Sequence, residues 1–434
     1  MEQKTHQAWG AASLAALLML TSCGGDDGHG AGSGEATQQQ PASGDEAAEG
    51  TEAPTGEAAD RAEQGSEEGG PEQDGPEQAP DVPEASSTSL AHETTLHQDS
   101  LTDTIISPKS VVTSGDGLAI ANNMLYQNTV TVYDTETREL VQELPDTVNP
   151  GDLGAEGYPE SVQGAPVEAV WTEDGQYAYV SNYRLADMGA SADDSCTAGE
   201  GIAPSAVYRY SVAEQDWDQF IEVGRVPKFV ELTPDGSRLL VTNWCDFDLS
   251  VIDTETGEEE FRVPLNAQPR GIAAMADNET VYVTAMYADE LYRVDLESQQ
   301  SEVIYDQASF PRHLVLSPDG ETLYVTFSRS NLLVAFDTET DEVIRTASTG
   351  QEPRTMDISA DGSALYIVNY DEDTVSKFDA ESFEEISREP TGHLPIGVSY
   401  DPMTASVWVA NYSGTIDVFD DSGEPDDSRE AAEE

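Results

Sequence analysis

The feature that most constrains the fold of this chain is a repeat of 42 residues. Five prolines stand 42 residues apart, and each opens a unit of the same form: Pro227, Pro269, Pro311, Pro353 and Pro395. Each unit holds a short apolar run, in most copies a tight turn such as Pro-Asp-Gly, and then further strand-like runs. A period near 42 with four short strands per unit is typical of the blades of a β-propeller. We therefore predict an all-β fold built from four-stranded antiparallel blades.

Two less regular units precede these copies. They open at Pro108 and Pro166, which stand 58 and 61 residues before the next opening proline. Seven blades are therefore expected over residues 100–420. The extra residues fall around 149–164, between blades 1 and 2, and around 185–204, between the second and third strands of blade 2. Alternate connections of an antiparallel meander leave on alternate faces, so both insertions are expected on one face, called here the insertion face.

The last blade lacks a fourth strand in the sequence that follows it. Three strand-like runs follow Pro395 before an acidic tail, residues 421–434, which we expect to be disordered. The run LTDTII at residues 101–106 stands where other units have their fourth strand. We predict that this N-terminal run completes blade 7 and closes the ring, which removes its free edge.

The N-terminal 99 residues read as a signal and a tether. Residues 1–23 combine Lys4, a short apolar stretch and the ending Leu-Thr-Ser-Cys, which resembles the lipobox of bacterial lipoproteins. That resemblance implies acyl chains on Cys23 and an anchor in the lipid bilayer, with the propeller on the extracytoplasmic side. The alternative is an ordinary secretory signal with an incidental cysteine. Residues 24–99 are acidic and poor in large apolar residues, so they are expected to form a disordered linker.

The charge of the chain is strongly negative. It has 85 Asp and Glu against 19 Lys and Arg, a net charge of −66. The excess extends into the repeats, because residues 101–420 hold 58 acidic and 16 basic residues, a net of −42. Such a surface repels nucleic acid, which we exclude as a partner. Self-repulsion of this size is tolerated where salt screens it, so we hypothesise adaptation to high ionic strength.

Two cysteines are expected to form a disulfide bond. Cys196 lies in the second insertion, and Cys245 lies in the matching connection of the next blade. Both belong to the insertion face of an exported protein, where disulfides persist. We predict a Cys196–Cys245 bond; the alternative is two free thiols.

Several segments resemble the YVTN family of seven-bladed propellers. They are VTNWCDFDLSVIDTETGE at 241–258, YVSN at 179–182 and YIVNYDEDTVSKFDAES at 366–382. The resemblance implies a cell-envelope or surface-layer protein. The repeat is also similar to propellers of lactonases, amine dehydrogenases and nitrous oxide reductase, so it does not fix a function. The chain departs from the motif where Ala285 and Phe327 replace its asparagine.

The position after the opening proline is mostly cationic. The first strand of a blade is innermost, so its start lies at the rim of the central channel. A ring of cations there is suited to a carboxylate or polyanion, which arginine binds in a bidentate manner. The alternative is that each cation neutralises a nearby acid. The cations are Lys109, Lys228, Arg270, Arg312 and Arg354, while Val167 and Ile396 occupy the same position in blades 2 and 7.

Aromatic residues follow the asparagine of the motif on the same face. Aromatic platforms beside polar groups suit a saccharide or a planar ligand. The alternative is that the asparagine caps a turn and the ring packs on its neighbour. The aromatic residues are Tyr183, Trp244, Tyr370 and Tyr412.

Signals of catalysis are few. His313 and His393 are the two histidines of the propeller, both expected on the insertion face, where they are candidates for ligand binding or an acid–base pair. The chain has no CxxCH haem motif, P-loop, GxGxxG opening a helix or GxSxG elbow. We therefore predict no catalytic residue, metal or cofactor.

Two functions of different classes remain open from the sequence. The first is a binding module that presents its insertion face to an envelope glycan, an anionic small molecule or a protein partner. The second is a lactonase-like hydrolase or a periplasmic oxidoreductase that uses the same face.

The negative charge of the chain predicts that its stability depends on salt. Added salt screens the repulsion between acidic side chains, so the melting temperature should rise between 0.1 M and about 2 M sodium chloride. Circular dichroism during heating would measure it, and a melting temperature that stays constant or falls would contradict the hypothesis of adaptation to salt.

Overall fold

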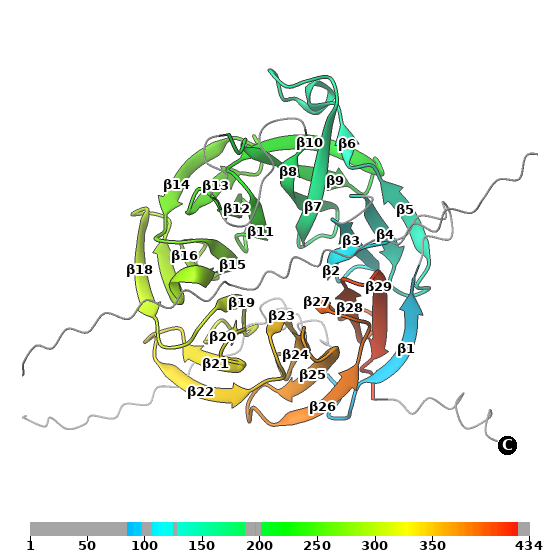
Figure 1. Cartoon of the computed structure of the whole chain (residues 1–434), viewed down its shortest axis with the longest axis vertical. Helices are drawn as coiled ribbons and strands as arrows, with labels where there is room; N and C mark the ends of the chain where they lie inside the picture. Colours follow the sequence, from blue (N-terminus) through cyan, green and yellow to red (C-terminus); the bar gives the residue numbers. More distant parts are fainter. Residues whose placement is uncertain (1–84, 98–105, 125–127, 187–195, 197–200, 424–434) are drawn as a thin grey trace, which may run out of the picture. The chain divides into compact units, whose positions relative to one another are not determined.

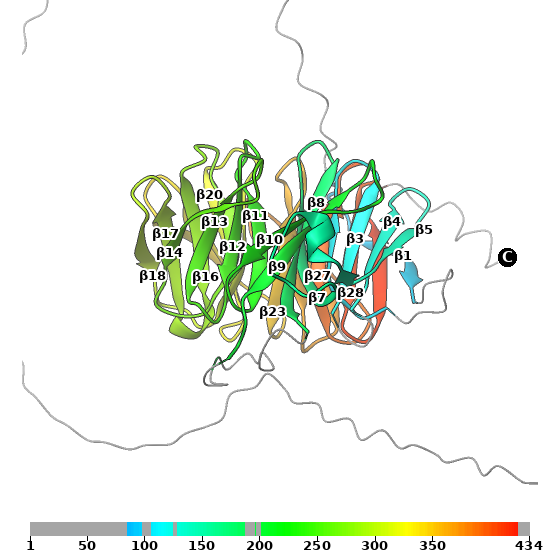
Figure 2. The ribbon, with the colours of Figure 1, turned by 90° about the horizontal axis from the view of Figure 1, so that it is seen from above.

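The computed structural model describes residues 85–97, 106–124, 128–186, 196 and 201–423. Over these residues the chain forms seven antiparallel blades arranged in a ring (Figure 1). The strands run between the two faces of the ring, as its edge view shows (Figure 2). The predicted seven-bladed β-propeller is thus confirmed.

Each blade contributes four strands from the channel outward. The innermost strands are β2 (Pro108–Thr113), β7 (Val162–Trp171), β11 (Pro227–Leu232), β15 (Pro269–Ala274), β19 (Pro311–Leu316), β23 (Pro353–Ile358) and β27 (Pro395–Asp401). The second strands are β3 (Leu118–Asn123), β8 (Tyr177–Leu185), β12 (Arg238–Asn243), β16 (Thr280–Ala285), β20 (Thr322–Phe327), β24 (Ala364–Asn369) and β28 (Ser406–Asn411).

The outer half of each blade is equally regular. The third strands are β4 (Val130–Asp134), β9 (Ser205–Ser211), β13 (Asp248–Asp253), β17 (Glu290–Asp295), β21 (Leu332–Asp337), β25 (Thr374–Asp379) and β29 (Thr415–Asp420). The outermost strands are β5 (Leu140–Leu144), β10 (Asp216–Val223), β14 (Glu259–Pro264), β18 (Gln300–Tyr305), β22 (Val343–Ser348), β26 (Glu385–Pro390) and β1 (Ala91–Leu96).

The position of a strand in its blade decides its composition. Second strands lie between two neighbouring strands and between two neighbouring blades, and all six residues of β24 are buried. Outermost strands face solvent, and β22 is exposed at nearly every position. Most innermost strands begin at the opening proline, where a missing N–H costs little because the ladder starts there. The hydrophobic core therefore lies between blades, where side chains of adjacent sheets interdigitate.

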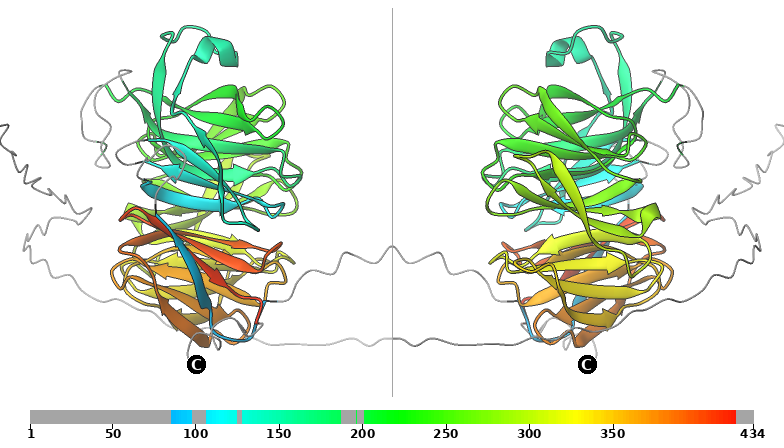
Figure 3. Two further views of the ribbon diagram at one scale, coloured as in Figure 1. Left: turned by 90° about the vertical axis from the view of Figure 1, so that its right-hand side faces the viewer. Right: turned by 90° about the vertical axis from the view of Figure 1, so that its left-hand side faces the viewer.

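The strand that closes the ring differs from the one we predicted. β1 pairs antiparallel with β29 and completes blade 7, so the closing strand is residues 91–96 and not residues 101–106. Figure 3 shows β1 lying along β29. The prediction assumed the short connection that joins other blades, whereas eleven residues separate Leu96 from Pro108. Residues 101–105 lie outside the described part of the chain, and Ile106 is buried without belonging to a strand.

Two predicted boundaries move as a result. Residues 85–97 belong to the propeller, although they were assigned to the linker over 24–99. At the other end, Asp421 is buried, although it was assigned to the acidic tail. Its carboxylate forms an ion pair with Lys377 of β25, and neither side chain has exposed surface. The remaining linker, the tail from residue 424 and the signal with Cys23 lie outside the described residues.

Residues 85–90, called here the strap, lead into β1 and lie across blades 6 and 7. The N–H of Ala85 donates to Asp361 at 3.0 Å, and the N–H of Leu90 donates to the Ser387 hydroxyl at 3.3 Å. The Lys377 ammonium donates to the carbonyls of Ser86 and Thr88. Side chains of blade 6 therefore hold the chain that completes blade 7.

The insertions lie where the repeat placed them. The first forms β6 (Thr147–Val148), which pairs with an extended β7, and the short helix η1 (Pro150–Leu153). The second joins β8 to β9. Because strands alternate in direction, both connections leave their blades at the same face. No helix in the described ranges is long and apolar enough to cross a membrane.

Candidate ligand-binding site

The candidate site is the mouth of the channel on the insertion face, where the innermost strands start. The residue after the opening proline is buried or half-buried in every blade. Val167 and Ile396 fill two of the seven positions with apolar side chains, and cations occupy the other five. The site residues predicted from the repeat therefore share one level of the channel.

The charges of these five cations act on one another across the ring. Burial and then the charges of Arg270, Arg312 and Lys228 hold the pKa of Lys109 well below its usual value. Burial and then the charges of Arg270 and Arg354 act on the pKa of Arg312 in the same direction. Arg270 on β15 thus acts on Lys109 of blade 1 and on Arg312 of blade 5.

Two acids partly compensate this charge. Glu168 on β7 counteracts the lowering of the pKa of Lys109, while burial raises its own pKa. Glu352, just before β23, forms an ion pair with Arg354 at 3.2 Å. The alternative of an acid beside each cation is met at Arg354, and the charge of Glu352 also acts on Arg312. The charges of Lys109, Arg270 and Arg312 still oppose one another. A bound anion would relieve that repulsion.

Aromatic side chains hold one of the cations in place. The Lys228 ammonium lies 4.4 Å from the ring centroid of Tyr183 and 5.1 Å from that of Trp244. Such contacts stabilise a cation without neutralising it. The predicted disulfide bond is formed next to these two rings. Cys196 and Cys245 are bonded, with their Cα atoms 5.2 Å apart, and they pack with Trp244.

A second aromatic pair lies on the other side of the mouth. Arg354 is 3.9 Å from the ring centroid of Tyr370, and Tyr370 meets Tyr412 edge to face at 6.4 Å. The predicted cationic and aromatic residues therefore form one surface around the mouth.

Further residues of this surface were missed by the sequence analysis. Tyr287 is 48% exposed and bridges Trp244 and Phe310 with ring distances of 5.5 and 5.2 Å. Arg329 lies 3.8 Å from the ring centroid of Phe310. The motif did not identify Tyr287, because Ala285 replaces the motif asparagine in blade 4 and the helix η2 (Met286–Ala288) follows it. An aromatic residue two positions after the motif was the signal available.

The motif asparagines themselves serve the fold. Asn369 is fully buried, and its amide accepts from the N–H of Gly350 and donates to the Ser376 hydroxyl at 2.8 Å. Asn411 donates to Thr415 and Asp417 in the same way. They cap the connections on the insertion face, which is the alternative given above for the motif asparagines.

His313 lies in the channel wall one position below the cations. Its ring meets Phe229 of blade 3 edge to face at 5.0 Å, and its Nδ1 accepts from the N–H of Met356 at 3.4 Å. Burial and the charges of Arg270 and Arg312 lower its pKa to about 3, so the ring is neutral. Gly271 of the intervening blade packs closely against the backbone of this strand, because a Cβ there would lie 3.1 Å from the Arg312 carbonyl.

His393 occupies a different environment. It is exposed, and its Nδ1 is 3.0 Å from a carboxylate oxygen of Asp373. The two histidines thus have separate partners, and the hypothesised acid–base pair is not formed. In the part of the chain that the structure describes, no cluster of three or more His, Cys, Asp or Glu side chains has the arrangement of a metal site.

Two carboxyl groups lie deeper in the channel, four positions after the opening proline. Burial raises the pKa of Glu231 on β11 to about 7, and the charge of Asp357 on β23 contributes. Burial likewise raises the pKa of Asp357 to about 6, although the N–H of Tyr400 donates to it at 2.7 Å. Glu231 also lines a hollow of about 870 Å³ at the face opposite the insertions. The channel is therefore cationic at one mouth and carries acids near the other.

Comparison with known proteins agrees with this fold. No protein-family model matches the chain, and no curated protein matches it. Among solved structures, Kuenenia stuttgartiensis Hydrazine Synthase is similar, with a TM-score of 0.58 and 18% sequence identity. The alignment covers 72% of this chain and 95% of that chain. At this identity the similarity shows the fold alone.

The raised pKa of Glu231 predicts a pH-dependent effect of Glu231→Gln. The pKa of Glu231 is about 7 in the folded protein against an ordinary 4.5, so folding favours the protonated carboxyl. This contribution to the unfolding free energy is present in full below pH 4.5 and is lost as the pH rises through 7. Glutamine stays neutral, so the variant should gain about 1–3 kcal/mol of unfolding free energy at pH 8 and change little at pH 4.5.

Urea unfolding at both pH values would measure this difference. Glu255→Gln, at an exposed position of the same blade, is the matched control and should show no gain at either pH. Equal or lower stability of Glu231→Gln at pH 8 would show that the carboxylate is accommodated in its ionised form.

Proposed function

We propose that this chain is an extracytoplasmic binding module whose cationic channel mouth takes an anionic ligand, and that this ligand is an acidic glycan of the cell envelope. One observation carries the proposal. Lys109, Arg270 and Arg312 repel one another in a buried setting, within a chain whose net charge is −66. Concentrating like charge costs stability, and such costs are typical of binding sites.

The chemistry of the mouth suits uronic acid residues. Guanidinium groups match a carboxylate in a bidentate manner, and aromatic rings provide faces on which a sugar ring stacks. Tyr370 supplies such a ring beside Arg354, and Tyr412 and Tyr287 add further rings on the same face. Buried charges are also screened less than exposed ones, so this recognition would persist at high ionic strength.

The sequence adds a location to this proposal. Cys23 and the acidic linker would tether the propeller to a membrane, as expected for a lipoprotein that belongs among the YVTN-repeat propellers. A tether keeps the binding face close to the envelope and raises the effective concentration of its ligand. The propeller fold and the propeller-like structural neighbour are consistent with an interaction module.

The test is the affinity for a uronic acid polymer. Polygalacturonate should bind the full chain in isothermal titration calorimetry, and neutral dextran should not. Arg270→Gln with Arg312→Gln should weaken the binding at least tenfold, since a single charge-assisted hydrogen bond contributes about 1.5–3 kcal/mol.

Arg262→Gln is the matched control, because it removes a cation from the outer strand β14 and should leave the affinity unchanged. Equal affinity of the double variant and the unchanged chain would remove the cationic mouth from the account. Circular dichroism would confirm that each variant remains folded.

A further inference from the structure

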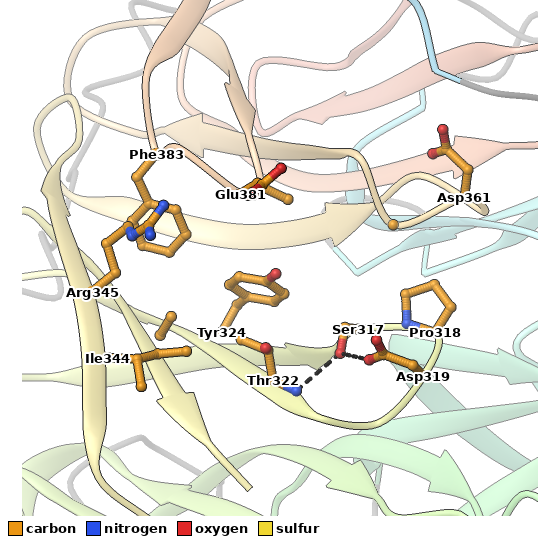
Figure 4. A pocket seen from close by; sticks show the side chains of 13 residues that line it. Ser317, Pro318, Asp319, Thr322, Tyr324, Ile344, Arg345, Asp361, Glu381 and Phe383 are labelled. Atoms are coloured by element: carbon orange, nitrogen blue, oxygen red, sulfur yellow. Dashed lines mark hydrogen bonds between the residues drawn. The ribbon is translucent and has the colours of Figure 1, made fainter.

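Between blades 5 and 6, on the face opposite the insertions, lies a groove of about 410 Å³ (Figure 4). Tyr324, Ile344 and Arg345 of blade 5 line one side, and Glu381 and Phe383 of blade 6 line the other. The repeat allows this groove to be compared with its neighbours, because a residue 42 positions further along occupies the equivalent place in the next blade.

The equivalent groove between blades 6 and 7 is filled. Tyr366, the counterpart of Tyr324, donates to Asp421 at 2.5 Å, and Asp421 also pairs with Lys377. The strap lies over these side chains, with Leu90 buried against Tyr366 and Ala364. An inter-blade groove of this propeller therefore holds a short segment of polypeptide, which bends at Ser87 and Thr88.

The equivalent groove between blades 4 and 5 is bridged by side chains. Tyr282 is the counterpart of Tyr324, and its hydroxyl donates to Asp341 at 3.1 Å. Arg293 forms an ion pair with the same carboxylate. Polar side chains thus span the two blades at this position.

The groove between blades 5 and 6 has apolar residues at the bridging positions. Ala335 stands where its neighbours carry Arg293 and Lys377, and Phe383 stands where the preceding blade carries Asp341. The Arg345 guanidinium lies 5.8 Å from the Phe383 ring, and Ile344 is 54% exposed. The site that holds the strap in one groove is therefore present in another, with an apolar floor in place of the ion pair.

We propose that this groove binds a short segment of a partner polypeptide, with one large apolar side chain flanked by basic residues. The apolar residue would take the place that Leu90 has in the strap, against Tyr324 and Phe383. Asp319 corresponds to Asp361, which accepts the backbone N–H of Ala85. Acidic residues outnumber Arg345 along the groove, since Asp319, Asp361 and Glu381 all line it.

The charge of the groove selects among the polypeptides that could occupy it. The segment before the strap reads Glu-Gln-Ala-Pro-Asp-Val-Pro-Glu over residues 77–84, so it is acidic and would be repelled. A second copy of the chain carries the same net charge of −66. A basic partner is the occupant that complements the acids at the rim.

The experiment uses fluorescence anisotropy of the labelled peptide Lys-Ser-Ser-Thr-Ser-Leu-Lys, which places the strap sequence Ser-Ser-Thr-Ser-Leu between two lysines. The full chain should bind it saturably with a Kd below about 1 mM. Ala335→Lys with Ala380→Asp rebuilds the arrangement of Lys377 and Asp421 beside Tyr324 and should weaken the binding at least tenfold. Gln300→Lys with Asn266→Asp introduces the same charges at exposed positions of blade 4 and its entry, and should bind as the unchanged chain does.

Further arms keep the result decisive. If the rebuilt pair prevents folding, Ile344→Ser provides a second variant at an exposed position, and it should weaken binding at least threefold. A chain without residues 24–84 should bind the peptide as the full chain does; a tenfold gain would mean that its own linker occupies the groove. The proposal would be overturned if a peptide with glutamates in place of the lysines bound as tightly as the lysine peptide. It would also be overturned if both groove variants bound the lysine peptide as tightly as the unchanged chain, or if the unchanged chain showed no binding up to 1 mM.

Discussion

Closure of the ring by an N-terminal strand is the interaction on which the rest of the structure depends. β1 pairs with β29, and the strap before it is held by the buried Lys377–Asp421 pair. Losing one partner of such a pair costs about 3–5 kcal/mol in general, because the other charge stays buried alone. Only a closed ring brings the innermost strands of blades 1 and 7 together, where a Cβ on Gly397 would meet the Ser110 backbone at 3.0 Å. The channel mouth exists because the ends of the domain are joined.

The closed ring turns a repeat in the sequence into a site. Seven equivalent strands place seven equivalent residues around one axis, so a cation repeated in five units becomes a cluster. Deviations from the repeat then make the two ends of the channel differ. The Phe229–His313 contact lies one position after the cations, and Glu231 places a carboxyl group two positions further along its strand. Outside the channel, Ala335 breaks the series of bridging pairs and leaves a groove between blades 5 and 6.

Much of this arrangement could be predicted because the 42-residue period assigns equivalent positions to residues in different blades. It located the blades, both insertions, the Cys196–Cys245 bond and the level shared by Lys109 and Arg312. It failed for the closing strand, since the length of the connection before Pro108 is not set by the repeat. Tyr287 was missed where blade 4 departs from the motif. The groove between blades 5 and 6 depends on which side chains of adjacent blades meet. The sequence of one repeat unit does not show this.

The central claim is that the cationic mouth is a site for an anion. The most direct measurement is a crystal structure of the protein with a short galacturonate oligomer. The account predicts a carboxylate of the oligomer within hydrogen-bond distance of Arg270 or Arg312, with a sugar ring against Tyr287, Tyr370 or Tyr412. An oligomer bound elsewhere on the propeller, or an empty mouth at saturating ligand, would contradict it.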